Sequence, residues 1–236
     1  MTSSFHDALE RAVCPLIAEI KPSSPKVGPL LAKRSVSQIA DDYLHAGAPC
    51  LSVTTGAWHK GNIGMVSEMA ATGLPVLRKD FITSQRHLDA SKEAGASAVL
   101  LTCTLLRRAD ILRLAEAALA MGLTPFVEAA NAKELDGLML PSGAILAINN
   151  RDIRAQETDD GGIEQSEALF DLAKATHRGL LVSASGLLSP SAVTRAMDTG
   201  FDGVLVGTAL LSGERGIQET TKAYLNAAGQ KAGLFA

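Results

Sequence analysis

The sequence predicts a single (β/α)8 TIM barrel, and three observations lead to that fold class. Eight short apolar runs alternate with segments of helical pattern, the starts of successive runs lie between 20 and 36 residues apart, and polar residues follow the ends of most runs. Such an interval holds one strand, one helix and two short loops. With 236 residues, 47% of them hydrophobic, the chain is large enough to bury the core that a barrel requires.

The apolar runs have the character of strands buried on both faces, because most of them are continuous rather than alternating. In chain order they are Leu16–Ile20, Cys50–Thr54, Pro75–Leu77, Ala98–Thr102, Thr124–Val127, Ala144–Ile148, Leu180–Val182 and Gly203–Val206. We expect them to form one parallel sheet that closes on itself and is covered by the helices between the runs.

The segments between the runs carry helical signals. The first, Ser35–Ala46, has an apolar face and is followed by Gly47, a good C-terminal stop. Further helices are expected at Ser84–Ala94, Ala109–Met121 and Pro190–Thr199, each followed by a glycine. An open doubly wound sheet is the rival fold, but its usual GxGxxG loop after the first strand is missing.

The barrel accounts for the whole chain, residues 1–236, as one domain, because no linker or low-complexity segment interrupts the alternation. A short lead-in of about residues 1–15 precedes the first strand. Within it, Ser4–Val13 is expected to form an amphipathic helix with Phe5, Leu9 and Val13 facing inward.

Composition narrows the classes of function. A net charge of −3 without a basic block disfavours nucleic-acid binding. No apolar stretch reaches the roughly 18 residues of a membrane span, and charged residues occupy the place of a signal peptide's apolar region, so we expect a cytoplasmic protein. Three cysteines without CxxC spacing and five scattered histidines favour neither disulfides nor a metal site, and no cofactor is expected.

Polar residues gather where six of the runs end. They are Glu19 with Lys21, Lys79 with Asp80, Glu128, Asn149 with Arg151, Ser183 with Ser185, and Gly207 with Thr208. In a closed barrel these carboxyl ends converge on one mouth, where barrel enzymes keep their active sites. Two lysines and two glutamates in a partly desolvated mouth can divide acid and base roles between them, so the constellation indicates an enzyme. A structural pairing of Lys with Glu is the competing interpretation for any one of them.

A phosphate site is expected in the loops after the seventh and eighth strands. Ser185-Gly186 and Gly207-Thr208 offer small residues whose backbone N–H groups can approach an anion, and Ser24 can add a hydroxyl. Glycines in such loops also serve as simple turn residues, which is the competing interpretation.

In order along the chain, these residues resemble the indole-3-glycerol phosphate synthase family. The segments that carry the resemblance are Ala18-Glu19-Ile20-Lys21 with Ser24-Pro25, Leu77-Arg78-Lys79-Asp80-Phe81, Val127-Glu128, Ile148-Asn149-Asn150-Arg151-Asp152, Ser185-Gly186, and Val206-Gly207-Thr208-Ala209-Leu210. The similarity runs from about residue 16 to residue 212, and LRKDF with INNRD is highly specific in combination.

The resemblance implies a cofactor-free lyase of tryptophan biosynthesis. Its substrate, 1-(2-carboxyphenylamino)-1-deoxyribulose 5-phosphate, would undergo ring closure, loss of CO₂ and loss of water. Lys21 and Lys79 match the family's catalytic lysines and Glu128 its general base, while Glu19 and Asn149 match residues that orient them. Residues implied in substrate and phosphate binding are Arg151, Ser185, Ser24, Gly186, Gly207 and Thr208. Trp58 is a further candidate for substrate binding, because an aromatic side chain at a barrel mouth can stack on an aryl ring.

Three departures from the family pattern concern the aryl end of the substrate. Ala184 stands where the family usually has a glutamate, the N-terminal lead-in is shorter, and the loop 54–61 lacks the usual acidic residue. Trp58 in that loop can stack on an aryl ring or merely close the loop. Two alternatives therefore stand beside the family reaction: a related cyclisation or dehydration of another arylamino sugar phosphate in a specialised pathway, and a non-catalytic phosphometabolite-binding barrel. Either way the implied partner is a small-molecule sugar phosphate, while the oligomeric state stays open.

Overall fold

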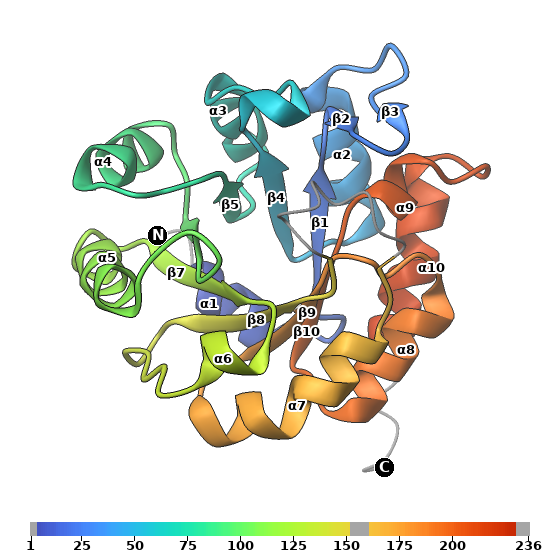
Figure 1. The fold of residues 1–236 in the computed structure, drawn as a ribbon. Coiled ribbons are helices and arrows are strands. Elements are labelled where there is room, and N and C mark those ends of the chain that lie inside the picture. The colour runs from blue at the N-terminus through green and yellow to red at the C-terminus, as the bar shows by residue number, and fades with distance from the viewer. Residues whose placement is uncertain (1–3, 152–160, 230–236) are drawn as a thin grey trace.

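The computed structural model describes residues 4–151 and 161–229, and these form a closed parallel barrel (Figure 1). Around the barrel the strand order is β1-β10-β9-β8-β7-β6-β5-β4, so the first and last barrel strands pair and close the ring. The barrel strands are β1 (Leu16–Ile20), β4 (Cys50–Thr54), β5 (Val76–Lys79), β6 (Ala98–Thr102), β7 (Thr124–Ala129), β8 (Ile145–Asn149), β9 (Leu181–Ala184) and β10 (Gly203–Val206). The (β/α)8 fold predicted from the sequence is confirmed.

Four of the strands have the bounds expected from the sequence, and the other four extend further toward their carboxyl ends. Lys79, Glu128 and Asn149 are therefore the ends of strands or lie within them, rather than in the loops that follow. A strand holds a side chain more rigidly than a loop does, because both neighbouring strands fix its backbone. A small antiparallel hairpin, β2 (Ser23–Ser24) with β3 (Gly28–Pro29), follows the carboxyl end of β1.

Helices surround the strands (Figure 1). They are α1 (Phe5–Glu10), α2 (Val36–Ala46), α3 (Gly64–Ala70), α4 (Gln85–Glu93), α5 (Arg108–Ala120), α6 (Ala132–Leu135), α7 (Glu164–Thr176), α8 (Pro190–Thr199), α9 (Thr208–Leu211) and α10 (Ile217–Gly229), with a 3-10 turn at Ala57–His59. Local sequence explains their limits. Ser35 and Gln38 form a capping box at the start of α2, and Gly47 ends it in the left-handed region at φ 96°.

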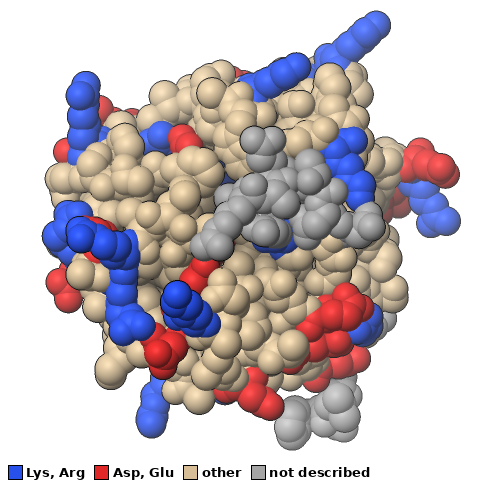
Figure 2. Space-filling view, viewed as in Figure 1, with Lys and Arg blue, Asp and Glu red and all other residues tan. Residues whose placement is uncertain are grey.

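The apolar core has two parts, as expected of a barrel. Outward-facing strand residues pack against the helices, while the interior is filled by a separate cluster that includes Ile17, Cys50, Leu77 and Phe126. No described helix is long and apolar enough to cross a bilayer. On the face drawn in Figure 2, Lys and Arg are scattered among Asp and Glu over the described surface without a continuous basic stripe.

Helix α1 closes the N-terminal end of the barrel, opposite the mouth. Phe5 and Leu9 are buried in the interior cluster, and the backbone N–H of His6 donates to Thr124 Oγ1, at the first residue of β7, over 3.3 Å. Ser4 caps the helix through a hydrogen bond from the N–H of Asp7. The expectation that Val13 also faces inward is wrong: α1 ends at Glu10, and Val13 is 76% exposed.

We therefore expect Phe5→Ala to lower the free energy of unfolding by about 3–5 kcal/mol, because it empties a fully buried site in the interior cluster. The matched control Val13→Ala removes an exposed side chain and should change the free energy of unfolding by less than about 0.5 kcal/mol. Urea unfolding followed by circular dichroism measures both. Equal effects of the two substitutions would show that α1 does not contribute to the core.

Candidate active site

Four charged side chains form a continuous chain of ion pairs inside the barrel mouth. Lys21 Nζ lies 3.8 Å from Glu19 Oε1, Lys79 Nζ lies 3.8 Å from Glu19 Oε2, and Lys79 Nζ lies 3.5 Å from Glu128 Oε1. Positive and negative charges thus alternate from β1 across β5 to β7. The sequence pattern predicted these residues at one mouth, and the structure brings each charged group within 3.8 Å of an opposite charge.

Asn149, the last residue of β8, and Arg151, just beyond it, extend this chain of contacts. The Asn149 side-chain amide donates to Glu128 Oε2 over 3.3 Å, and its carbonyl oxygen accepts a hydrogen bond from the backbone N–H of Arg151 over 3.0 Å. Asn149 therefore orients the Glu128 carboxylate on one side and the turn that carries Arg151 on the other.

The charged network is almost completely shielded from solvent. Lys21 is 4% exposed, Lys79 is 7% exposed and Glu128 is 1% exposed. Charges in such surroundings interact more strongly than they would in water, and they stay ionised only when paired. The alternation of signs is what makes burial of four charged groups possible.

Two side chains that the sequence analysis did not single out hold Glu19 in place. Ser52 Oγ on β4 donates to Glu19 Oε2 over 3.2 Å, and the Tyr43 hydroxyl on α2 donates to the Glu19 backbone carbonyl over 3.1 Å. Burial, with Glu19 nearby, raises the pKa of Tyr43 well above its ordinary value, so this phenol stays a hydrogen-bond donor. The one sequence signal for Ser52 is that side chains alternate between the two faces along the strand predicted at Cys50–Thr54, which puts Ser52 on the same face as Cys50 and Thr54.

A small pocket beside the network collects most of the residues expected to bind phosphate. Its lining includes Lys21, Arg151, Ser185, Gly186, Gly207 and Thr208, together with Glu19. Ser185 and Gly186 both adopt left-handed backbone conformations, at φ 65° and 69°. A Cβ atom at Gly186 would come within 2.8 Å of the backbone nitrogen of Gly162, so only glycine fits there.

Gly207 lies close to Glu19. A Cβ atom built on it would lie 2.9 Å from Glu19 Oε1. The loop after β10 therefore packs directly on the first carboxylate of the network, and any substitution at Gly207 disturbs both the pocket and Glu19.

Ser24 and Trp58 lie apart from that pocket. Ser24, on β2, is buried, whereas Trp58 is 36% exposed and lies beside two rings. Its ring centroid is 3.8 Å from that of His59 and 6.0 Å from that of Phe81, the latter pair nearly parallel at 13°. His59 in turn is buried, with Nδ1 2.9 Å from the Ser23 carbonyl oxygen, so it ties the Trp58 turn to β2.

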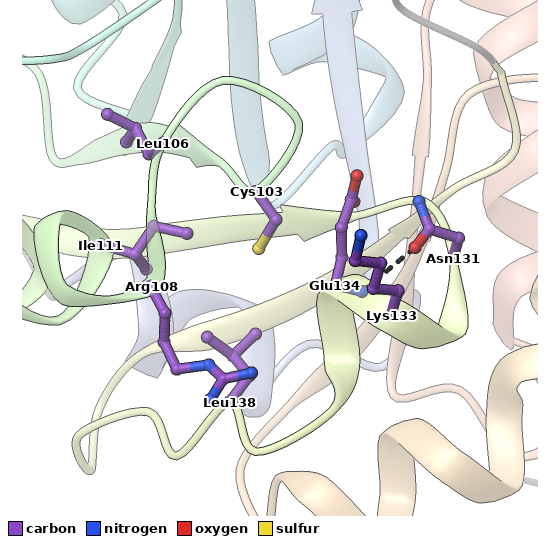
Figure 3. Close-up of a pocket in the computed structure, with 8 residues that line it drawn as sticks. All are labelled: Cys103, Leu106, Arg108, Ile111, Asn131, Lys133, Glu134 and Leu138. Carbon is purple, nitrogen blue, oxygen red and sulfur yellow. Dashed lines mark hydrogen bonds between the residues drawn. The ribbon is translucent and has the colours of Figure 1, made fainter.

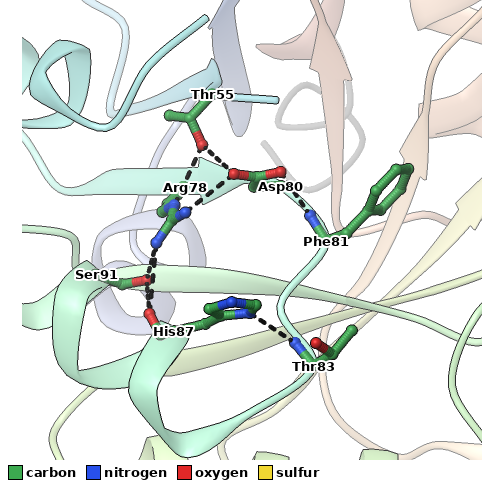
Figure 4. Close-up of polar contacts among 7 residues, drawn as sticks. All are labelled: Thr55, Arg78, Asp80, Phe81, Thr83, His87 and Ser91. Carbon is green, nitrogen blue, oxygen red and sulfur yellow. Dashed lines mark hydrogen bonds and ion pairs between the residues drawn. The ribbon is translucent and has the colours of Figure 1, made fainter. Parts of the chain in front are cut away.

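A hydrogen-bonded group behind Lys79 fixes the end of β5 (Figure 4). Arg78 donates to Thr55 Oγ1, Ser91 Oγ and Asp80 Oδ2 over 3.0–3.1 Å. Asp80 also accepts from Thr55 Oγ1 and from the N–H of Phe81, both over 2.8 Å. Burial alone would raise the pKa of Asp80, but these hydrogen bonds and the Arg78 charge outweigh it and lower that pKa. Asp80 is thus bound into the scaffold.

The close-up in Figure 3 shows a different pocket, of about 520 Å³, between the segments that follow β6 and β7. Its apolar lining, Leu106, Ile111 and Leu138, belongs to the cluster between sheet and helices, so the pocket lies outside the barrel. Burial, with Glu134 and Glu128 nearby, raises the pKa of the Cys103 thiol to about 12, which makes it a poor nucleophile.

Metal-ligating side chains within the described ranges gather away from the mouth. His6, Asp7 and Glu10 on α1 place ligand atoms within 4.8 Å of one another, at the N-terminal end of the barrel. They share no residue with the network of Lys21, Glu19, Lys79 and Glu128. The mouth itself offers lysine, carboxylate and amide groups, a donor set suited to proton transfer.

Fold and site together define a barrel enzyme of the acid–base type, with a buried lysine–glutamate network beside a small polar pocket. A family model described as indole-3-glycerol phosphate synthase matches residues 1–222. The chain belongs to the indole-3-glycerol phosphate synthase family, as the resemblance of its motifs implied.

Relatives within the family are similar over most of their length. The indole-3-glycerol phosphate synthase of Pyrococcus furiosus is 38% identical over 202 residues, which make up 85% of this chain and 87% of the relative. Indole-3-glycerol phosphate synthase 2 of Ralstonia nicotianae is 34% identical over 217 residues, covering 90% of this chain and 79% of the relative.

Solved structures with lower sequence identity share the fold. Tryptophan synthase from M. tuberculosis superposes with a TM-score of 0.67 at 14% identity and covers 94% of both chains. The 3-hexulose-6-phosphate synthase of Salmonella typhimurium gives a TM-score of 0.66 at 15% identity, covering 91% of this chain and 98% of that one. At these identities the likeness concerns the barrel alone.

The hydrogen bonds of Asp80 generate a prediction about stability and pH. Asp80→Asn should lower the free energy of unfolding at pH 7 by about 1–3 kcal/mol, because Arg78 and Thr55 lose a charged acceptor. Folding lowers the pKa of this carboxyl, so its contribution is present above the ordinary value of about 3.9 and is lost as the pH falls through the lowered value. The difference in the free energy of unfolding between the wild type and Asp80→Asn should therefore become smaller in acid.

Urea unfolding at pH 7 and at pH 3 measures this difference in the free energy of unfolding. Asp89→Asn, on the exposed surface of α4, is the matched control and should change little at either pH. A difference for Asp80→Asn that stays constant between the two pH values would contradict an ionised, hydrogen-bonded Asp80.

Proposed function

We propose that the protein converts 1-(2-carboxyphenylamino)-1-deoxyribulose 5-phosphate into indole-3-glycerol phosphate, with release of CO₂ and water. One observation carries this proposal: the network of Lys21, Glu19, Lys79 and Glu128 lies beside a small pocket that Lys21, Arg151 and the loops after β9 and β10 line. The reaction needs proton donors and a base around one carbon atom, and a phosphate anchor at a fixed distance from it.

Ring closure is the first step. The aryl carbon that bears the carboxylate attacks the ketone carbon, a carbon–carbon bond forms, and the ketone oxygen takes a proton to become a hydroxyl. A lysine ammonium group supplies that proton and stabilises the developing negative charge. Loss of CO₂ then leaves its bonding electron pair in the ring and restores aromaticity.

Dehydration is the last step. The new hydroxyl leaves as water after accepting a proton, and a base removes a proton from the ring system as the indole double bond forms. Glu128 is the base in this proposal, and one of the lysines is the acid. Because Lys79 Nζ lies 3.5 Å from Glu128 Oε1, a proton can return between acid and base without crossing the barrel. Lys21 and Lys79 each serve one of the two chemical steps, while Glu19 and Asn149 orient them.

The phosphate group is assigned to the pocket formed by the loops after β9 and β10. Gly186, Gly207 and Thr208 supply the close backbone approach, and Ser185 and Arg151 add polar contacts. Ser24, on β2 and outside this lining, is proposed as a further phosphate contact. The aryl group then extends toward Trp58 and Phe81, where an aromatic ring finds stacking partners.

Ala184 supports a second candidate, a related reaction of a different arylamino sugar phosphate. This residue is fully buried between Asn149 on β8 and Leu205 on β10, where the family pattern expects a carboxylate. An apolar residue there changes the charge of the site and the shape offered to the substrate. A barrel that only binds a phosphometabolite would gain nothing from four buried charges at the mouth.

The cellular setting follows the same proposal. Free thiols at Cys14, Cys50 and Cys103 suit a reducing compartment, so we place the protein in the cytoplasm. The expected partner is the sugar phosphate substrate itself.

Incubation of the purified protein with the carboxyphenylamino sugar phosphate tests the function through the appearance of indole fluorescence. We expect Lys79→Met and Glu128→Gln each to lower kcat by roughly 10²-fold or more, since each removes a positioned acid or base. Lys92→Met, on the exposed surface of α4, is the control and should retain full activity. Near-normal turnover by either mouth variant would remove that residue from the mechanism, and inactive wild type would disprove the proposed substrate.

Position 184 provides a separate test of substrate choice. Ala184→Glu should raise kcat/KM for the carboxyphenylamino substrate by up to about 10-fold if a carboxylate beside Asn149 assists the reaction. It should also lower the melting temperature, because it buries another carboxylate.

Ala184→Gln is the matched control, since it adds the same bulk without the charge. It should reproduce the loss in melting temperature only in part and leave kcat/KM without gain. A wild-type protein with ordinary enzymatic rates that gains nothing from Ala184→Glu would show that the carboxylate is dispensable and would exclude the second candidate.

A further inference from the structure

Thr54, the last residue of β4, occupies a position between the two lysines of the site. In the β4–β5 register it is the direct partner of Lys79. On its other side β1 pairs with β4 up to Ile20 and Val53, and the next residues along the two chains are Lys21 and Thr54. The strand that carries Thr54 therefore separates the strand of one lysine from the strand of the other.

The Thr54 side chain belongs to the inner face of the barrel. Side chains alternate along a strand, and two positions earlier Ser52 bonds Glu19 in the interior, while Cys50 lies in the interior core cluster. Its register partner Lys79 also points inward, since its Nζ contacts Glu19 and Glu128. Thr54 thus lies on the wall of the mouth, at the level of the catalytic ammonium groups.

The Thr54 hydroxyl has no hydrogen-bond partner, although it is buried. The residue is 2% exposed, and its Oγ1, with Ser24 Oγ, is one of two hydroxyl oxygens in the described part of the chain that are buried without a partner. A buried polar group without a partner costs free energy, and a valine would fill the same volume without that cost. Thr54 is as shielded as Lys21 and Glu128, and its register partner is Lys79, so its hydroxyl is a buried polar group beside the strand end that carries this lysine.

We propose that Thr54 is a further substrate-contacting residue, whose hydroxyl donates a hydrogen bond to the substrate oxygen on which Lys21 and Lys79 act. In the proposed reaction, on which this inference rests, that atom is the ketone oxygen that becomes a hydroxyl on ring closure. Three donors, two ammonium groups and one hydroxyl, then surround the oxygen where negative charge develops. No proton needs to leave Thr54 in either step.

The test compares Thr54→Val, which keeps the shape and removes the hydroxyl, with Thr54→Ser, which keeps the hydroxyl. We expect Thr54→Val to lower kcat by about 10-fold or more with KM changed by less than about 3-fold, since the contact strengthens as charge develops. Thr54→Ser should retain most of kcat. The melting temperature of Thr54→Val should equal or exceed that of the wild type, because an unpaired polar atom has been removed.

Two controls separate a local effect from a general one. Thr221→Val removes a buried hydroxyl that bonds the Ile217 carbonyl oxygen within α10, away from the mouth, and should leave kcat unchanged. Inhibition by inorganic phosphate should be the same in the wild type and in Thr54→Val, because the phosphate pocket does not include Thr54. If Thr54→Val does not fold, Thr54→Ala provides a second variant without the hydroxyl.

Each result decides between the proposals. If the wild type turns over the carboxyphenylamino substrate and Thr54→Val keeps kcat within about 2-fold, the hydroxyl does not contact the reacting oxygen and only this inference fails. Equal losses in Thr54→Val and Thr54→Ser would also overturn it, since they would reflect packing of the whole side chain. If the wild type shows no turnover, the proposed function fails and this inference fails with it.

Discussion

The structure depends on one electrostatic constraint, the need to neutralise four charges inside a barrel that excludes water. Glu19 lies 3.8 Å from the ammonium groups of both Lys21 and Lys79, and Glu128 lies on the far side of Lys79. Removing any one group would leave an uncompensated charge in the interior. The neighbouring features follow from this: Ser52 and Tyr43 fix Glu19, Asn149 fixes Glu128, and a Cβ atom at Gly207 in the loop after β10 would crowd Glu19.

The constraint also separates the barrel into ends with different tasks. Phe5 and Leu9 of α1 fill the N-terminal end with apolar contacts. At the mouth, polar side chains stand on strand ends and are braced from behind, as Asp80 and Arg78 brace the end of β5. The apolar contacts of α1 thus lie at one end of the barrel and the lysine–glutamate network at the other, where barrel enzymes keep their active sites.

Much of this could be predicted from the sequence because its signals are local. Continuous apolar runs with polar ends identify buried parallel strands, and glycines such as Gly47 and Gly200 mark helix ends. Glu19, Lys79 and Glu128 were recognisable because charged residues stand at or just beyond the carboxyl ends of apolar runs. Ser52 and Thr54 were not, because a small hydroxyl residue in an apolar run looks like packing until the register shows which strands flank it. Val13 was placed wrongly because a helical pattern does not reveal that the chain leaves the helix at Glu10.

The pairing of β1 with β10 joins parts of the chain that are almost 190 residues apart, Leu16 with Val204 and Ala18 with Val206. Contacts of such sequence separation form late, since a long loop must close before they are gained. The same pairing brings the loop after β10 against Glu19. A refolding chain can therefore acquire most of its helices and strands before the loop after β10 packs against the Glu19 carboxylate, and recovery of activity becomes a kinetic marker for the closing of the ring.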